Sequence, residues 1–397
     1  MIYLDNNATT QPTPAVAQAI HVATTTLWAN PSSVHRPGQE ARHALELARK
    51  ELATLLGVPS REIVLTSSGT ESINLAIRGV LESNRGGTLP APTDPHPLPT
   101  IVTTRLEHTA VRDLVLHLER QGQVEIRWLP LDARGIADPA ALDALLDDRT
   151  ALVSVQWANN ETGVIQPVER LAEICRARGV PFHCDAVQWV GKMPLPEALP
   201  CDLLTFSAHK FHGPKGVGGL WVRRGVGLVP QTIGTQETDR RGGTESVAAI
   251  VGAGVAAREA AAWLADPTAR AKTAALRDRF ETEIIRRTPT TPGAVINSRD
   301  CPRLWNTTSI AFPALEAEAM LMLLSERGLA ASAGAACSSG SLDPSPVLLA
   351  MGIPEPLAHG SIRFSLTRNT TDAEINDAIE IVVAAATQLG RSSASTR

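Results

Sequence analysis

Cysteine is scarce in this sequence, and its spacing argues against two kinds of site. The 397 residues include five cysteines, and no two of them form a CxxC pair. An odd, widely spaced set does not indicate a disulfide framework or a zinc site. His209 and His212 have a spacing seen in metal-binding helices, but Gly213 and Pro214 follow at once and no second pair of ligands is evident. We therefore predict no metal site.

The sequence also lacks an excess of positive charge and a long apolar run. The net charge is −4 and the isoelectric point is about 6.2, which predicts no nucleic-acid partner. The apolar stretch over residues 247–257 is short and rich in glycine, and residues 1–5 do not resemble a signal peptide, so we expect no membrane span. The composition is that of a folded cytoplasmic protein whose partners are small molecules and other proteins.

Short runs rich in β-branched residues alternate with helical periodicity through the first part of the chain. Strands are predicted over residues 62–66, 100–103, 151–155, 180–183, 203–206 and 219–222, with helices such as 106–121 and 168–178 between them. The alternation predicts an α/β fold in which a mostly parallel sheet has helices on both faces. Ligands of such sheets bind outside the carboxyl ends of the strands. The polar residues expected at those ends are Thr66, His108, Asn160, Asp185 and Lys210.

The pattern changes after about residue 260, which predicts a second domain. We expect a large domain over residues 15–260 and a smaller α+β domain made of residues 1–14 and 261–397. The expected elements of the smaller domain are a long helix over 258–287, strands over 308–312 and 361–365, and a final helix over 372–389. Residues 86–99 are predicted to form an exposed insertion, and the polar tail 390–397 is predicted to be disordered.

Two residues after predicted strands suit a pyridoxal phosphate (PLP) site. Lys210 follows the run 203–206, where its amine could form a Schiff base with the cofactor aldehyde. Asp185 ends another run, where a carboxylate could pair with the pyridinium nitrogen and keep the ring an electron sink. Taken alone, such a lysine is more often an ion-pair partner and such an aspartate a helix cap. The residues around them decide between these interpretations.

Three further polar motifs follow predicted strands. Residues 66–72 open a helix, where backbone N–H groups and hydroxyls could hold a phosphate, although Ser68 and Glu71 also fit an ordinary capping box. His108 could stack on the pyridine ring and carry protons near neutral pH, and its alternative role is structural. Asn160 could donate to the phenolic oxygen of the cofactor, although Asn-rich segments before glycine are also common loops.

Cys337 and Arg363 complete the candidate residues. Cys337 lies in a run of Gly, Ala and Ser without a bulky anchor, so the thiol could move to a bound substrate and act as a nucleophile. Its alternative is a small buried cysteine among small residues. Arg363 could bind a substrate α-carboxylate with its planar guanidinium, or it could belong to a surface ion pair.

With these residues assembled, the sequence resembles the cysteine desulfurases of the NifS/IscS type. They belong to the class V aminotransferase family, which has fold type I of the PLP enzymes. The resemblance extends over residues 1 to about 390 and rests on motifs that occur in the same order, namely residues 3–10, 30–35, 66–72, 159–161, 183–188, 207–210, 241–244 and 361–366. Cys337 and its small neighbours point to the desulfurases within the family.

The resemblance assigns a role to each candidate residue. It implies that Lys210 carries PLP, that Asp185 pairs with the pyridinium and that His108 stacks on the ring. The other residues are implied to bind the phosphate (Gly69, Thr70, Ser207 and His209), the phenolic oxygen (Asn160 and Gln188), the partner subunit's phosphate in a homodimer (Thr244), and the substrate (Arg363, with Asn160).

The activity implied by the resemblance is removal of sulfur from L-cysteine. Its products are alanine and a persulfide on Cys337, which passes the sulfur to an acceptor such as an iron–sulfur scaffold protein. A selenocysteine lyase or another class V enzyme is the alternative. The sequence leaves open both the choice between cysteine and selenocysteine and the identity of the acceptor.

Overall fold

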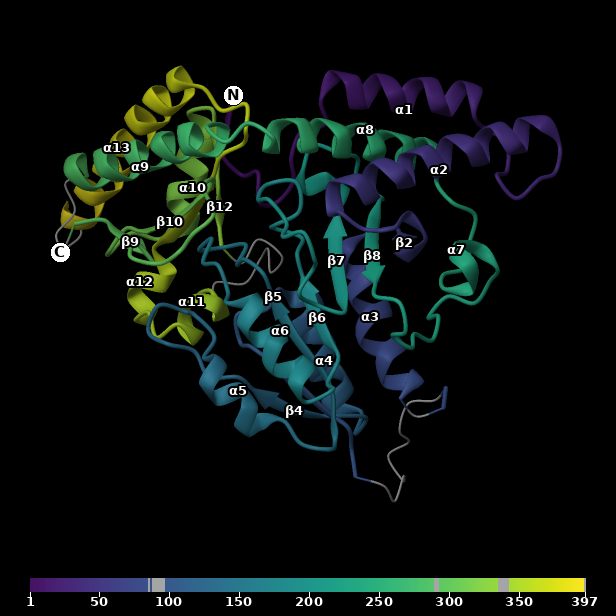
Figure 1. Ribbon diagram of the computed structural model, residues 1–397. Coiled ribbons are helices and arrows are strands. Elements are labelled where there is room, and N and C mark those ends of the chain that lie inside the picture. The colour runs from purple at the N-terminus through teal and green to yellow at the C-terminus, as the bar shows by residue number, and fades with distance from the viewer. Residues whose placement is uncertain (85, 88–96, 289–292, 335–342, 396–397) are drawn as a thin grey trace.

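The computed structural model describes residues 1–397 except 85, 88–96, 289–292, 335–342 and 396–397. Its central element is a seven-stranded sheet with the order β2-β8-β7-β6-β5-β3-β4, in which β8 is antiparallel to β2 and β7 and all other neighbours are parallel (Figure 1). The mostly parallel sheet predicted from the sequence is confirmed. Its strands are β2 (Ile63–Thr66), β3 (Thr100–Thr103), β4 (Glu125–Trp128), β5 (Thr150–Gln156), β6 (Phe182–Asp185), β7 (Leu203–Ser207) and β8 (Gly218–Val222).

Helices cover both faces of this sheet because successive strand residues point to opposite sides. On one face Val64, Ile101 and Leu152 pack against α3 and α4. On the other face the neighbouring residues, Leu65 and Val153 among them, pack against α2, α5, α6 and α8. The helices of this part are α1 (Pro14–Thr26), α2 (Arg36–Leu56), α3 (Gly69–Ser83), α4 (Thr109–Arg120), α5 (Pro139–Leu145), α6 (Val168–Ala177), α7 (Gln236–Asp239) and α8 (Val247–Leu264), with the short 3₁₀ turns η1 (Ser60–Glu62) and η2 (Ala208–Lys210).

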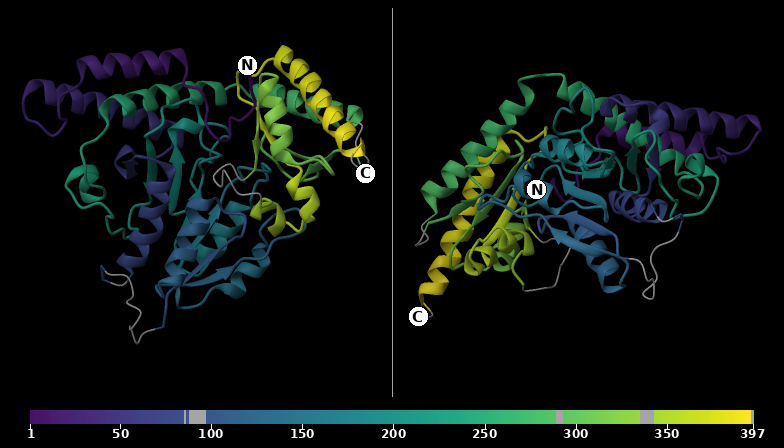
Figure 2. Two further views of the ribbon diagram at one scale, coloured as in Figure 1. Left: turned by 180° about the vertical axis from the view of Figure 1, so that it is seen from behind. Right: turned by 60° about the horizontal axis from the view of Figure 1, so that its bottom comes forward.

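Helix α8 is apolar because it is packed between other helices. Among the described residues it is the one helix whose length and composition would suit a membrane span, so the apolar segment is longer than the sequence suggested. A Cβ atom added at Gly252 would lie 2.5 Å from Ile20 of α1, and one added at Gly254 would lie 2.7 Å from Ala48 of α2. These close approaches are those of a buried helix in a globular domain. Figure 2 shows α1 and α2 extending beyond the rest of the molecule.

A second, four-stranded antiparallel sheet has the order β12-β13-β10-β9 and packs against α9, α10 and α13. Its elements are α9 (Ala269–Arg287), β9 (Val295–Asn297), β10 (Thr307–Ala311), α10 (Ala317–Glu326), β11 (Leu329–Ala330), β12 (Ser332–Ala333), α11 (Pro346–Ala350), α12 (Glu355–His359), β13 (Ser361–Ser365) and α13 (Asp372–Ser395). The sheet has its own hydrophobic core, which includes Phe280, Phe312 and Phe364. The domain division at residue 260 remains a prediction.

Two predictions for this part were wrong. The helix expected over 258–287 is interrupted between Leu264 and Ala269, because Pro267 lacks the N–H that a continuous helix needs. The tail expected to be disordered from residue 390 is helical as far as Ser395, because nothing in it breaks the helix that begins at Asp372. The expected strand at 180–183 begins two residues later, at Phe182.

The first ten residues connect the two sheets. The strand β1 (Ile2–Tyr3) pairs with β11, and Asp5 forms a bridge with Ser365 at the end of β13. The segment then crosses to the large sheet, where the backbone N–H of Thr10 donates to the carbonyl oxygen of His209 at 2.9 Å. Residues 5–10 therefore lie between the carboxyl ends of the large sheet and the strand β13.

Candidate active site

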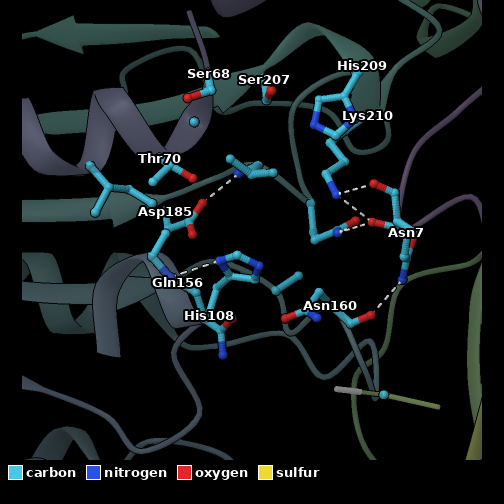
Figure 3. A pocket seen from close by; sticks show the side chains of 18 of the residues that line it. Asn7, Ser68, Thr70, His108, Gln156, Asn160, Asp185, Ser207, His209 and Lys210 are labelled. Atoms are coloured by element: carbon cyan, nitrogen blue, oxygen red, sulfur yellow. Dashed lines mark hydrogen bonds between the residues drawn. The ribbon is translucent and has the colours of Figure 1, made fainter. Parts of the chain in front are cut away.

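The carboxyl ends of the parallel strands open into a cavity of about 360 Å³. Ten of the twelve predicted site residues line it, although they come from segments that lie up to 294 positions apart. They are Gly69, Thr70, His108, Asn160, Asp185, Gln188, Ser207, His209, Lys210 and Arg363. Figure 3 shows Asp185 and His108 on one side of this cavity and Lys210 and Asn7 on the other.

Lys210 is held by the N-terminal segment. It follows β7 in the turn η2, and its Nζ donates to the carbonyl oxygens of Asn7 and Ala8 at 2.7 Å each (Figure 3). The neighbouring His209 accepts or donates at Nδ1 with the Thr9 hydroxyl at 3.1 Å. Burial, together with the charge of Lys210, lowers the pKa of His209 to about 3, so its ring is neutral at pH 7. The lysine amine thus lies in a pocket whose nearest histidine carries no charge.

Asp185 is the last residue of β6 and is buried beneath the cavity floor. One carboxylate oxygen accepts from the backbone N–H of Val187 at 3.0 Å. Burial raises the pKa of this carboxyl to about 6, although the Val187 N–H and the charge of Lys210 oppose the rise. A buried carboxylate whose pKa is raised by desolvation binds a proton or a cationic N–H more strongly than an exposed one does. This is the property required of a partner for a pyridinium nitrogen.

His108 caps the helix α4, and this contact fixes its tautomer. Its Nδ1 accepts from the backbone N–H of Ala110 at 3.1 Å, so in the neutral ring the proton resides on Nε2. Burial and the positive charge of Lys210 lower the pKa of His108 to about 4. Behind it, burial raises the pKa of Glu107 to about 8; this carboxyl accepts from the Thr104 hydroxyl and from the backbone N–H of Gln156. His108 is therefore neutral at pH 7.

One end of the cavity has the features of an anion site. It is formed by the N-terminus of α3, where Gly69 and Thr70 contribute first-turn N–H groups that the helix itself does not use. Ser68 caps the helix by accepting from the backbone N–H of Glu71, so the predicted cap is present as well. The hydroxyl of Ser207 is buried and has no hydrogen-bond partner in the described part of the chain. An unsatisfied buried hydroxyl beside a helix N-terminus fits a phosphate ligand.

The opposite end is formed by Arg363 of β13, whose side chain is only 2% exposed. One of its terminal nitrogens donates to a carboxylate oxygen of Asp5 at 2.6 Å, and the other donates to the carbonyl oxygen of Asn160 at 3.1 Å. Its Nε is buried without a partner among the described residues. The alternative of a surface ion pair is excluded by this burial. The guanidinium can bind a carboxylate that enters the cavity.

Comparisons with known proteins agree with this geometry. The family model described as "Aminotransferase class-V" matches residues 2–377. The chain belongs to the class V aminotransferase family. It is 45% identical over 384 residues to a cysteine desulfurase of Nostoc sp., an alignment that covers 96% of this chain and 92% of that one.

Solved structures lead to the same family. A NifS-like protein superposes with a TM-score of 0.86 at 36% identity and covers 98% of this chain and 100% of its own. A structure titled "SspA in complex with cysteine" superposes with a TM-score of 0.77 at 29% identity and covers 94% of this chain and 100% of its own. The predicted enzyme class, a cysteine desulfurase of the NifS/IscS type with the fold of type I PLP enzymes, is confirmed.

Two of the predicted residues of this class V enzyme remain, Cys337 and Thr244. Cys337 falls outside the described residues. Thr244 is exposed and does not line the cavity of its own chain. Its loop is connected to the N-terminus of α3, because the guanidinium of Arg241 donates to Glu71 in the first turn of that helix at 2.7 Å. The predicted reach of Thr244 to a partner subunit stays a prediction.

Two residues of the site received no role from the sequence. Asn7 accepts at its carbonyl oxygen from both Lys210 and Gln188, and its side chain donates to the carbonyl oxygen of Asn160 at 3.0 Å. Lys192 is buried, and its Nζ contacts Asn7 and Gln188. Asn7 belongs to the motif at residues 3–10 on which the resemblance rests, but the resemblance gave this residue no role. Nothing in the sequence around Lys192, which comes shortly after Trp189 and Val190, indicates that it lies near the site. Its burial in the structure is what singles it out.

Proposed function

We propose that this chain is a PLP-dependent cysteine desulfurase that converts L-cysteine to L-alanine and transfers the sulfur to Cys337. The observation that carries the proposal is the cavity itself, whose lining includes Lys210, Asp185, a neutral His108 and the buried Arg363. Relatives that are named cysteine desulfurases at 45% identity support the same reaction. An aminotransferase has no need of a cysteine nucleophile, so Cys337 supports a desulfurase over that alternative.

The residues present fit PLP, because the buried hydroxyl of Ser207 and the start of α3 form an anion site and Asp185 lies on the cavity floor. Gly69, Thr70, Ser207 and His209 would hold the phosphate, while Asn160 and Gln188 would hold the phenolic oxygen. When bound through Lys210, PLP supplies an electron sink that stabilises negative charge at the substrate Cα.

The protein residues orient the substrate and move its protons. Arg363 binds the α-carboxylate of L-cysteine, while Asp5 and Asn160 keep the guanidinium in place. His108 is neutral, and its Nδ1 is occupied by the Ala110 N–H. Proton exchange by this ring therefore takes place at Nε2. The amine of Lys210, the residue that would hold PLP, is the second group that could take or return a proton near Cα.

Sulfur transfer is assigned to the thiolate of Cys337. The thiolate attacks the sulfur of the bound L-cysteine; an S–S bond forms and the substrate Cβ–S bond breaks. The two electrons of the broken bond stay on the carbon skeleton, which takes up protons and leaves as L-alanine. Cys337 is left as a persulfide, and no external oxidant or reductant is needed in this step. A thiol acceptor then removes the terminal sulfur.

We also propose that the enzyme is a cytoplasmic homodimer with a large domain over residues 15–260 and a small domain made of residues 1–14 and 261–397. Apolar side chains that are strongly exposed in the single chain support a dimer; they are Trp28 at 77%, Val34 at 94% and Ile233 at 84%. Thr244 would then reach the partner's phosphate site. The acceptor protein is proposed to be an iron–sulfur scaffold, and no nucleic acid or membrane takes part.

The decisive experiment compares wild type with Cys337→Ser on L-cysteine and a dithiol. The variant should bind the substrate with unchanged affinity yet release sulfide at least about 1000-fold more slowly, because a hydroxyl is a far weaker nucleophile than a thiolate. After a single turnover, mass spectrometry of wild type should place the persulfide on Cys337. Cys301, which is partly exposed, serves as the matched control and should stay unmodified. Near-normal sulfide release by the variant would defeat the proposal.

A further inference from the structure

Lys192 is a buried lysine that the proposed mechanism does not use. Its residue is only 4% exposed, and no carboxylate pairs with it among the residues that the structure describes. An unpaired ammonium in such a place is costly, so its retention calls for a physical reason. Burial, together with the positive charges of Lys210 and Arg363, accordingly lowers the pKa of Lys192 well below its usual value.

The contacts of Lys192 lead towards the active site but do not enter it. Its Nζ donates to Oε1 of Gln188 at 2.5 Å and to Oδ1 of Asn7 at 2.9 Å. Gln188 in turn donates from Nε2 to the carbonyl oxygen of Asn7 at 2.9 Å, and the same oxygen accepts from Lys210 at 2.7 Å. Gln188, Asn7 and Lys210 line the cavity, whereas Lys192 does not.

The amine of Lys192 helps to orient the two side-chain amides that it contacts. In its charged form it offers donors only, and its Nζ donates to Oε1 of Gln188 and to Oδ1 of Asn7, an oxygen that also accepts from the amide of Asn306 at 3.1 Å. In this arrangement Gln188 directs Oε1 towards Lys192 and Nε2 towards the carbonyl oxygen of Asn7. The same contact leaves the Asn7 side-chain N–H groups for the carbonyl oxygen of Asn160 and the hydroxyl of Thr307.

We propose that Lys192 is a positioning residue that fixes the amide of Gln188 as a hydrogen-bond donor to the cofactor. This inference rests on the proposed function in one respect, the binding of PLP by Lys210. Without Lys192 the described contact that still opposes a turn of the Gln188 amide is the one from Nε2 to the carbonyl oxygen of Asn7, so the Gln188 oxygen could face the cavity more often. An oxygen there would repel a negatively charged cofactor oxygen, which the present donor stabilises.

The test measures the visible absorption of the Lys210–cofactor link as a function of pH, without substrate. Loss of a donor to a charged oxygen raises the pKa at which that oxygen is protonated. Lys192→Met should therefore raise the midpoint of the spectral titration by about one unit, a tenfold change in the equilibrium. Lys215→Met is the matched control, because Lys215 is exposed on the segment that follows Lys210. The midpoint of the spectral titration of this variant should stay within about 0.3 units of wild type.

A double-mutant cycle decides whether Lys192 acts through Gln188. Gln188→Met should raise the midpoint by a similar amount, and the double variant should show the shift of one substitution rather than the sum of two. Additive shifts, or an unchanged midpoint in Lys192→Met, would overturn the inference.

A second variant covers the case in which Lys192→Met does not fold. Gln188→Glu keeps an oxygen for Lys192 but removes the Nε2 donor, so it should raise the midpoint while Lys192 remains in place. If Gln188→Glu left the midpoint at the wild-type value, the inference would be wrong. These spectra require neither turnover nor Cys337. If the variants show the expected shifts but the wild-type protein releases no sulfide from L-cysteine, the proposed function would be contradicted and the role of Lys192 would stand.

Discussion

The two ends of the active-site cavity are built in different ways. The first end, proposed to bind the phosphate, is formed by residues that follow a strand or open a helix, and the cap between Ser68 and Glu71 spans three positions. Contacts from distant segments, such as that of Thr9 with His209, only add to this end. At the other end, proposed to bind the substrate carboxylate, Arg363 is held by Asp5, which lies 358 positions earlier, and by Asn160, which lies 203 positions earlier. Local motifs contribute most to the phosphate end, and contacts between distant segments make the carboxylate end.

This difference indicates where residues can be substituted while PLP binding is kept. The phosphate end belongs to the large sheet, and its geometry depends on strands that are buried on both faces. The carboxylate end depends on how β13 and the N-terminal segment meet the large sheet. Substitutions there should alter the choice and affinity of the substrate, while PLP binding should stay close to that of the wild type.

Among the substitutions that test this comparison, Arg363→Lys is expected to have the largest effect. A lysine keeps the charge but loses the planar fork that binds a carboxylate with two hydrogen bonds. We expect kcat/KM for L-cysteine to fall about 100-fold, mainly through KM, while the cofactor absorption stays unchanged. Arg368→Lys is the control, since Arg368 is similarly buried and pairs with Glu259 outside this cavity. Equal losses in the two variants, or a change in the cofactor spectrum of Arg363→Lys, would break the distinction between the ends.

The same distinction explains what could be predicted from the sequence. Asp185, Lys210 and His108 could be placed from their own neighbours, because a residue after a buried strand lies at the carboxyl edge of the sheet. Nothing local to Asn7 or Lys192 showed that they would meet, since their contact depends on the path of the N-terminal segment between two sheets. The break at Pro267 was present in the sequence, but the helical periodicity on both sides of it concealed the interruption.

An intermediate effect is expected for His183, a buried residue in the interior of the large sheet. Its ring nitrogens contact the hydroxyls of Ser154 at 2.8 Å and Thr205 at 2.9 Å, and burial lowers its pKa from 6.5 to about 3. Below pH 6.5 the unfolded chain gains a proton that the folded protein does not, so stability falls as the pH decreases towards 3. Between pH 7.5 and pH 5 this one group should cost about 2 kcal/mol.

Urea unfolding of His183→Gln tests this expectation. Glutamine can keep hydrogen bonds but does not titrate, so the variant should lose about 2 kcal/mol less stability than wild type between pH 7.5 and pH 5. His43→Gln is the control, because His43 is exposed, and it should follow wild type at both pH values. A His183→Gln variant with the pH dependence of wild type would show that the ring is protonated in the folded protein.

The smallest effect is expected for Ser207→Ala at the phosphate end. The Ser207 hydroxyl is buried without a partner in the described part of the chain, so its removal should leave the stability of the cofactor-free protein within about 0.5 kcal/mol. PLP affinity should fall about tenfold, because one hydrogen bond to a charged group is lost. Ser154→Ala is the control with the reverse pattern, since it removes the hydroxyl that contacts His183 and should reduce stability without changing PLP affinity.

The path of the first ten residues determines the order in which the parts of the pocket can form during translation. The last strand of the large sheet ends at Val222, whereas the side chain of Asn6 bonds to Ser365, which lies 359 positions after it. At ordinary translation rates the ribosome needs roughly seven to thirty seconds to pass from Val222 to Ser365. During that interval a nascent chain can already have the large sheet, while Asn7 and Ala8 lack the strand that holds them beside Lys210. The pocket is therefore completed last, although part of its lining is translated first.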